Sequence, residues 1–115
     1  MIRGNNTETV AVLGASPNPD RYSNKAVRLL AAEGHRVIPI HPSAPSVEGI
    51  PAVRSLADLP EKVDTVTVYV SAKISSALQQ QMLEVRPRRV IFNPGSENPE
   101  LSDALRARGV AVQEA

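Results

Sequence analysis

The sequence contains no cysteine and no tryptophan, and its aromatic residues are only Tyr22, Tyr69 and Phe92. Without cysteine there can be no disulfide framework, no thiolate nucleophile and no cysteine-ligated zinc. So few aromatic side chains argue against binding of single-stranded nucleic acid, in which bases stack on exposed rings. The functions that stay open are therefore those that need neither a thiol nor aromatic side chains on which bases stack.

The sequence also lacks an excess of charge of either sign, since 13 Lys and Arg face 12 Asp and Glu and the formal net charge is +1. This balance gives no electrostatic case for binding nucleic acid or an anionic membrane. No apolar run approaches the length of a membrane span, and Met1–Glu8 lacks the apolar core of a secretion signal. We therefore predict a cytoplasmic protein that binds neither nucleic acid nor membrane. The sequence leaves a homo-oligomer open.

The 115 residues have ordinary globular composition, with 42% hydrophobic and 22% charged residues. A chain of this length supports one core, and we predict a single domain over residues 9–115 after a flexible polar lead-in over residues 1–8. Apolar runs that predict strands lie at residues 9–13, 36–40, 65–70, 89–92 and 110–112. Three helices are expected: from near Ser23 to Gly34, from Ser71 through Met82, and from the Asn98-Pro99 cap to Gly109. In the second helix, Ile74, Leu78 and Met82 form an apolar stripe that we assign to the core.

The segment 43–53, with three prolines and a glycine, predicts a loop with a short edge strand at Ala52-Val53. Residues 55–58 resemble a one-turn helix with a capping box. Strands that alternate with helices at these spacings predict an α/β fold with right-handed crossovers. We expect a Rossmann-like, doubly wound, mostly parallel sheet of five to six strands with helices on both faces.

The turn Gly14-Ala15-Ser16 follows the first predicted strand, where such sheets bind ligands at their switch point. Glycine allows a tight turn and close approach of a ligand, and the amides of the next helix favour an anion. Ser16 adds a hydroxyl donor. Ser23, Asn24 and Lys25 open the helix and could converge on the same phosphate, so the turn predicts nucleotide binding.

The identity of the nucleotide depends on the flanking positions. The dinucleotide fingerprint asks for three glycines and a later acid, but its positions here are Gly14, Ser16 and Pro19, and the second strand ends in His41-Pro42-Ser43. NAD is therefore disfavoured, while NADP and the 3′-phosphate of coenzyme A stay open. Binding of a nucleoside triphosphate by a Walker motif is disfavoured because no Gly-Lys-Ser/Thr follows the turn.

An ordered series of motifs adds to these patterns. It comprises Gly14-Ala15-Ser16, Ser23-Asn24-Lys25, residues 37–42, Gly49-Ile50-Pro51, residues 55–60 and Val63-Asp64. The series resembles the stand-alone CoA-binding domain family, which is related to the N-terminal domain of the succinyl-CoA synthetase α subunit. The resemblance implies a Rossmann-like fold with coenzyme A as cofactor. In that picture Gly14, Ala15, Ser16, Ser23, Asn24 and Lys25 hold the phosphates, His41, Pro42 and Ser43 lie by the adenosine, and Val70 and Ser71 line the next strand end.

Asn93, Pro94 and Gly95 follow the strand at residues 89–92 and should face the same edge of the sheet. We expect this loop to contact the cofactor's pantetheine arm. Glu97 could act as a base, but no partnered nucleophile accompanies it, and we assign no catalytic or metal-binding residue. The leading hypothesis is a non-catalytic protein that binds coenzyme A or acyl-CoA. The alternatives are an NADP-binding oxidoreductase fragment, an acyl-CoA ligase subunit that needs a partner, and a Rossmann domain without a ligand.

Overall fold

The computed structural model describes residues 7–115, so most of the predicted lead-in, residues 1–6, lies outside the described part of the chain. Glu8, the last residue of that segment, is held at the start of the sheet. Its carboxylate accepts a hydrogen bond from the Thr65 hydroxyl at 2.6 Å and forms an ion pair with Arg89 at 3.1 Å. Glu8 therefore ties the start of β1 to β5 and β6.

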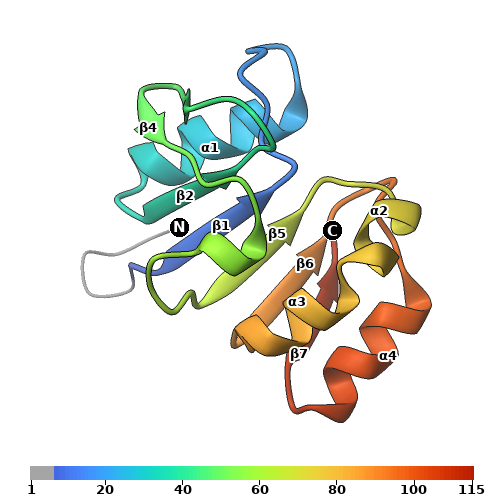
Figure 1. Cartoon of the computed structure of the whole chain (residues 1–115). Helices are drawn as coiled ribbons and strands as arrows, with labels where there is room; N and C mark the ends of the chain where they lie inside the picture. The colour runs from blue at the N-terminus through green and yellow to red at the C-terminus, as the bar shows by residue number, and fades with distance from the viewer. Residues whose placement is uncertain (1–6) are drawn as a thin grey trace.

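Five parallel strands form the main sheet, in the order β2-β1-β5-β6-β7. They are β1 (Thr9–Leu13), β2 (Arg36–Ile40), β5 (Thr65–Val68), β6 (Arg89–Phe92) and β7 (Ala111–Glu114) (Figure 1). The bounds of β1, β2 and β6 are those predicted, whereas β5 ends two residues early and β7 is shifted toward the C-terminus. The strand order reverses between β1 and β5, which makes their carboxyl ends the switch point.

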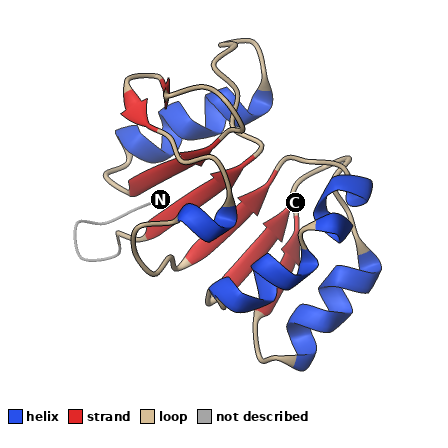
Figure 2. Cartoon of the chain, in the orientation of Figure 1, coloured by secondary structure: helices blue, strands red, loops and turns tan. Residues whose placement is uncertain are grey.

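Helices cover both faces of the sheet, and the doubly wound α/β fold is confirmed. They are α1 (Tyr22–Ala32), α2 (Ala72–Ala77), α3 (Gln79–Val85), α4 (Pro99–Ala107) and the single 3₁₀ turn η2 (Leu56–Asp58). Figure 2 shows α1 beside the first two strands and α2–α4 beside the later ones. No helix within residues 7–115 is long and apolar enough to cross a membrane.

Two hydrophobic cores lie on opposite faces of the sheet because successive strand residues point to opposite sides. The larger core joins Ala11, Leu13, Val66, Val68, Val90 and Phe92 to Leu56 of η2, Met82 of α3, and Leu101 and Leu105 of α4. The smaller core joins Val12 and Val37 to Val27 of α1. Because α1 packs mainly against β1 and β2, its side of the sheet is left largely open over β5 and β6. The side chains of Thr65, Thr67 and Arg89 lie on that side.

The helix expected after Ser71 is two helices, which meet at Leu78. The backbone tightens there, since the N–H of Leu78 bonds to the carbonyl of Ser75, three residues back. Met82 is fully buried and Leu78 packs against the core, but Ile74 is 51% exposed. The assignment of Ile74 to the core is therefore wrong, because α2 ends before its face can continue the stripe of α3.

A small hairpin replaces the loop and edge strand expected over residues 43–53. It pairs β3 (Ser46–Val47) with β4 (Ile50–Pro51) around Glu48 and Gly49, both at positive φ, while Val53 makes only an isolated bridge to Ile40. The one-turn helix is confirmed as η2, but it has no capping box. The hydroxyl of Ser55 instead bonds to the carboxylate of Asp58 at 2.9 Å.

Asn98 joins α4 to α2. Its Oδ1 caps α4 by accepting from Leu101 N at 3.1 Å, as the sequence predicts. Its Nδ2 lies within hydrogen-bond distance of Ser75 Oγ at 2.8 Å, Ser76 Oγ at 3.0 Å and Ala72 O at 3.3 Å. The side chain is only 3% exposed, so its hydrogen bonds are made away from bulk water.

We expect Asn98→Ala to lower the free energy of unfolding by about 2 kcal/mol, because it removes both the cap and the ties to α2. Asn98→Ser keeps a capping hydroxyl without the ties and should lose about half as much. Urea unfolding followed by circular dichroism measures both variants. A loss below about 1 kcal/mol in the alanine variant would show that the ties to α2 contribute nothing.

Candidate functional site

A cleft of about 790 Å³ lies at the switch point of the sheet. Its walls come from the turn after β1, the start of α1, and the residues that follow β5 and β6. The lining residues are Gly14, Asp20, Arg21, Tyr22, Ser23, Tyr69, Asn93 and Pro94. The cleft opens on the side of the sheet that carries α1, where β5 and β6 are not covered by a helix. The fold thus brings three separate turns to one hollow.

Gly14 is placed where only glycine fits. Its φ is +88°, and a Cβ there would lie 2.8 Å from Val70 Cγ1 and 3.2 Å from the carbonyl carbon of Tyr69. The chain leaving β5 therefore passes directly against the turn, and Val70 packs against the turn and the larger core. The next residue, Ala15, is buried and donates its N–H to the carbonyl of Ile40. This turn therefore lies between the segment that follows β5 and the last residue of β2.

The side chain of Asn24 anchors the turn Gly14-Ala15-Ser16, which is the candidate phosphate-binding loop. It is fully buried, and its Nδ2 donates to Ser16 O at 2.9 Å and to Glu48 Oε2 at 3.0 Å. Its Oδ1 accepts from Arg28 Nε at 2.9 Å. The Ser16 hydroxyl itself accepts from Asn18 N at 3.1 Å and so stabilises the loop. The side chain of Asn24, which the sequence places among phosphate ligands, is occupied by these partners.

Ser23 is the polar side chain at the start of α1 that faces the cleft. It is only 5% exposed, and its hydroxyl has no hydrogen-bond partner within residues 7–115 but is reached from the cleft. The first turn of α1 contains no acidic residue, and its N-cap residue Arg21 makes no capping bond through its side chain. The free amides at a helix N-terminus attract anions. The Ser23 hydroxyl beside them gives an anion a further donor.

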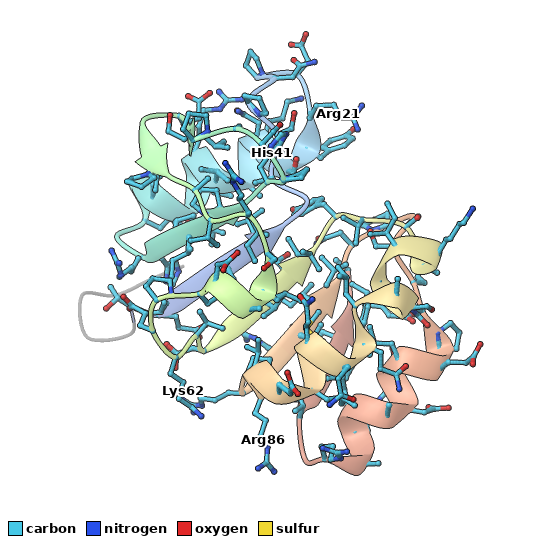
Figure 3. The ribbon with its side chains drawn as sticks, in the orientation of Figure 1. Arg21, His41, Lys62 and Arg86 are labelled. Carbon is cyan, nitrogen blue, oxygen red and sulfur yellow. The ribbon has the colours of Figure 1, made fainter. Side chains whose placement is uncertain are left out.

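The charged side chains at the mouth are Arg21 and Asp20, which both line the cleft. Arg21 was not singled out from the sequence; its position directly before the predicted helix is the signal that could have found it. Lys25 is exposed, and its Nζ lies 5.1 Å from the centre of the Tyr22 ring instead of lining the cleft. Figure 3 shows Arg21 and His41 at the cleft end of the molecule, opposite Lys62 and Arg86.

The residues expected beside the adenosine follow β2 and are not among those that line the cleft. His41 Nδ1 accepts from the backbone N–H groups of Ser43 at 3.0 Å and Ala44 at 2.7 Å, so the imidazole organises its own turn. Pro42 and Ser43 are exposed. They follow β2, which lies on the side of β1 that faces away from β5.

The later strand ends form the opposite wall of the cleft. Asn93 and Pro94 line it, while Gly95 N donates to Glu97 Oε1 at 2.9 Å and closes the turn. The carboxylate of Glu97, which the sequence offered as a base, thus accepts a hydrogen bond within the turn. Ser71 lies outside the lining and caps α2, with Ile74 N 3.4 Å from its hydroxyl.

Tyr69, which the sequence did not predict as a site residue, stands between these walls. Burial raises the pKa of its phenol above the usual value, and a hydrogen bond with the side chain of Thr67 lowers that pKa by less. The phenol therefore stays protonated and neutral at neutral pH. A neutral phenol adds a hydroxyl and an aromatic surface to the cleft without adding charge.

Comparisons with known proteins bear on the family and on the fold. Residues 8–115 match the sequence model of a family described as the CoA binding domain. The uncharacterized protein YneT of Bacillus subtilis (strain 168) is 26% identical over 106 residues, which are 92% of this chain and 78% of YneT. A solved structure from Thermus thermophilus is 34% identical with a TM-score of 0.89, covering 94% of this chain and 82% of that one.

A larger protein shares the fold. The acetyl-coenzyme A synthetase 1 of Ca. Korarchaeum cryptofilum superimposes on 90% of this chain with a TM-score of 0.76 and 24% identity. This chain covers 25% of that synthetase, so the likeness concerns the fold of one part of it.

Proposed function

Because this chain belongs to the CoA-binding domain family, we propose that it binds coenzyme A or an acyl-CoA in the cleft at the switch point. The phosphates lie against the turn at Gly14 and the first turn of α1. The amides of that helix end are the donors, and Ser23 and Arg21 add a hydroxyl and a guanidinium. Ser16 contributes its backbone amide from the turn, and Ala15, whose N–H is bonded to the carbonyl of Ile40, holds the turn in shape. Binding is proposed without catalysis, as a holding site for the cofactor.

The observation that carries this proposal is the hydroxyl of Ser23, which forms no hydrogen bond within residues 7–115 and belongs to a residue that lines the cleft. The hydroxyl is therefore available to form a hydrogen bond with a ligand atom in the cleft. Its place beside the free amides of α1 makes an anionic oxygen the fitting partner. The negative carboxylate of Asp20 at the mouth repels a second negative charge there. The anion is therefore limited to the inner part of the cleft.

The roles proposed for the remaining residues follow from their positions. Lys25 is not among the residues that line the cleft, and it attracts the anion at longer range. Asn24 acts by holding Ser16 and the loop, not by touching phosphate. His41, Pro42 and Ser43 flank the side of β1 where the adenosine would extend. Val70 and Ser71 support the wall after β5, while Asn93, Pro94 and Gly95 form the wall after β6.

Thermal unfolding with added ligands tests the proposal. We expect coenzyme A and acetyl-CoA to raise Tm, while NADP, NAD and ATP leave it unchanged. A ligand at 100 times its Kd stabilises the native state by about 2.7 kcal/mol, which is roughly 10 °C for a domain of this size. A shift with NADP and none with coenzyme A would overturn the ligand assignment.

Substitutions at Ser23 test the site separately from the ligand. Ser23→Ala should weaken coenzyme A binding by roughly 10- to 100-fold, because it removes a hydrogen bond to a charged group. Ser23→Asp should abolish binding, since it sets a carboxylate against the phosphate. Ser46 is an exposed serine on β3, so Ser46→Asp is the matched control for the added charge. This control variant should bind coenzyme A with wild-type affinity. Kd values from isothermal titration calorimetry decide the outcome; equal affinities for Ser23→Asp and Ser46→Asp would place the anion elsewhere.

A further inference from the structure

Asn93 presents a fixed hydrogen-bond acceptor on the wall of the cleft that lies away from α1. It follows β6, lines the cleft and is only 9% exposed. Its Nδ2 donates to Thr67 Oγ1 at 2.7 Å and to Val68 O at 2.9 Å. Its Oδ1 has no partner within residues 7–115 and is reached from the cleft. The amide therefore uses its donors inside the protein and leaves its acceptor for a ligand.

The orientation of this amide follows from the chemistry of its partners. A backbone carbonyl such as that of Val68 only accepts hydrogen bonds, so the NH₂ end of Asn93 must face it. Both amide hydrogens have acceptors within 3 Å, and rotation of the side chain would set Oδ1 against the carbonyl oxygen of Val68 and break both of these bonds. Oδ1 is thus held toward the cleft.

The cleft consequently has two chemically different ends. The end at Gly14 and Ser23 offers donors and attracts an anion, while the end at Asn93 offers an acceptor and disfavours one. One strand, β5, separates β1 from β6, so the two ends lie two strand spacings, or roughly 10 Å, apart. The cleft fits a ligand that is anionic at one end and carries a neutral N–H or O–H donor about 10 Å away.

We propose that Asn93 is a specificity-determining residue that accepts a hydrogen bond from an amide N–H on the arm extending from the ligand's phosphates. This inference rests on the proposed function, because coenzyme A carries two amides on the pantetheine arm beyond its diphosphate. An arm with a carboxylate or phosphate at that position is disfavoured, since an anionic oxygen would face Asn93 Oδ1. The adenosine lies toward β2, on the other side of β1, and does not compete for this acceptor.

Paired ligands separate this role from a structural one. Isothermal titration of wild type, Asn93→Ala and Ser23→Ala compares coenzyme A with adenosine 3′,5′-bisphosphate, which keeps two phosphates but has no arm. We expect Asn93→Ala to weaken coenzyme A binding about 5- to 10-fold and to leave bisphosphate binding unchanged. Ser23→Ala should weaken the binding of both ligands. Equal effects of Asn93→Ala on both ligands, or no effect on coenzyme A, would overturn the role of Asn93 while leaving coenzyme A binding intact.

A second measurement uses only the wild-type protein, because Asn93→Ala also removes two internal hydrogen bonds. Coenzyme A analogues in which each pantetheine amide in turn is replaced by an ester lack one N–H donor. One of the two analogues should bind about 5- to 10-fold more weakly than coenzyme A. Unchanged affinity for both analogues overturns the inference. A wild-type protein that binds neither coenzyme A nor the bisphosphate overturns the proposed function together with it.

Discussion

Gly14→Ala is expected to lower the free energy of unfolding by about 2–5 kcal/mol and to abolish coenzyme A binding. Two effects combine at this position. A side chain at φ +88° is strained by about 1–2 kcal/mol, and its Cβ would lie 2.8 Å from Val70 Cγ1 and 3.2 Å from backbone of Tyr69. The backbone contact cannot be relieved by a side-chain rotation, so the turn or the strand end must move, at a further cost of about 1–3 kcal/mol.

Gly109→Ala is the matched control for this substitution. Gly109 has a similar φ of +81°, but a Cβ there meets nothing within 4 Å. It should therefore lose only the conformational part, about 1–2 kcal/mol, and bind coenzyme A normally. Urea unfolding gives the two stabilities, and titration calorimetry gives the affinities. If the two variants are equally destabilised, the close approach of the segment after β5 does not constrain the turn.

Asn24→Ala is expected to lower the free energy of unfolding by about 2–3 kcal/mol and to weaken coenzyme A binding about tenfold. Alanine leaves the carbonyl of Ser16 without its donor and removes the partner of Arg28 Nε. The loop after Gly14 is then free to take other conformations, so the ligand must order it at the expense of affinity.

Glu48→Gln provides the comparison, because it keeps an acceptor for Asn24 Nδ2 and removes only the exposed charge. It should change stability by less than about 0.5 kcal/mol and leave binding unaltered. Urea unfolding and calorimetry on both variants give the answer. Stability of Asn24→Ala within about 0.5 kcal/mol of wild type would show that the loop is held by other contacts.

The strands were predictable because their signal is local. The runs that became β1, β2 and β6 are short, apolar and ended by glycine, proline or a polar residue, as expected for strands buried on both faces. The Asn98 cap and the turn at Gly14 were predictable for the same reason, since each depends on residue types at fixed spacing. The position of the cleft then followed from the topology of parallel sheets.

The parts that could not be predicted depend on contacts between distant segments. Asn24 has the appearance of a phosphate ligand in the sequence, but its side chain turns inward to Ser16 and to Glu48, which lies on a hairpin 24 residues away. Ile74 fits a helical stripe, but the backbone tightens at Leu78 and leaves Ile74 exposed. Tyr69 follows a strand and becomes a cleft residue only because β5 lies beside β1.

The strand order also has a consequence for the way in which the chain folds as it is synthesised. β1 is the first strand made, but it lies inside the sheet, and Thr9 N bonds to Asp64 Oδ2 across 55 residues. β2 can pair with β1 early, whereas the other edge of β1 stays open until β5 leaves the ribosome. At roughly 5–20 residues per second, the 28 residues from the end of β2 to the end of β5 take a few seconds. During that interval an apolar strand edge is exposed, and the nascent chain is then most prone to pair with another copy of itself.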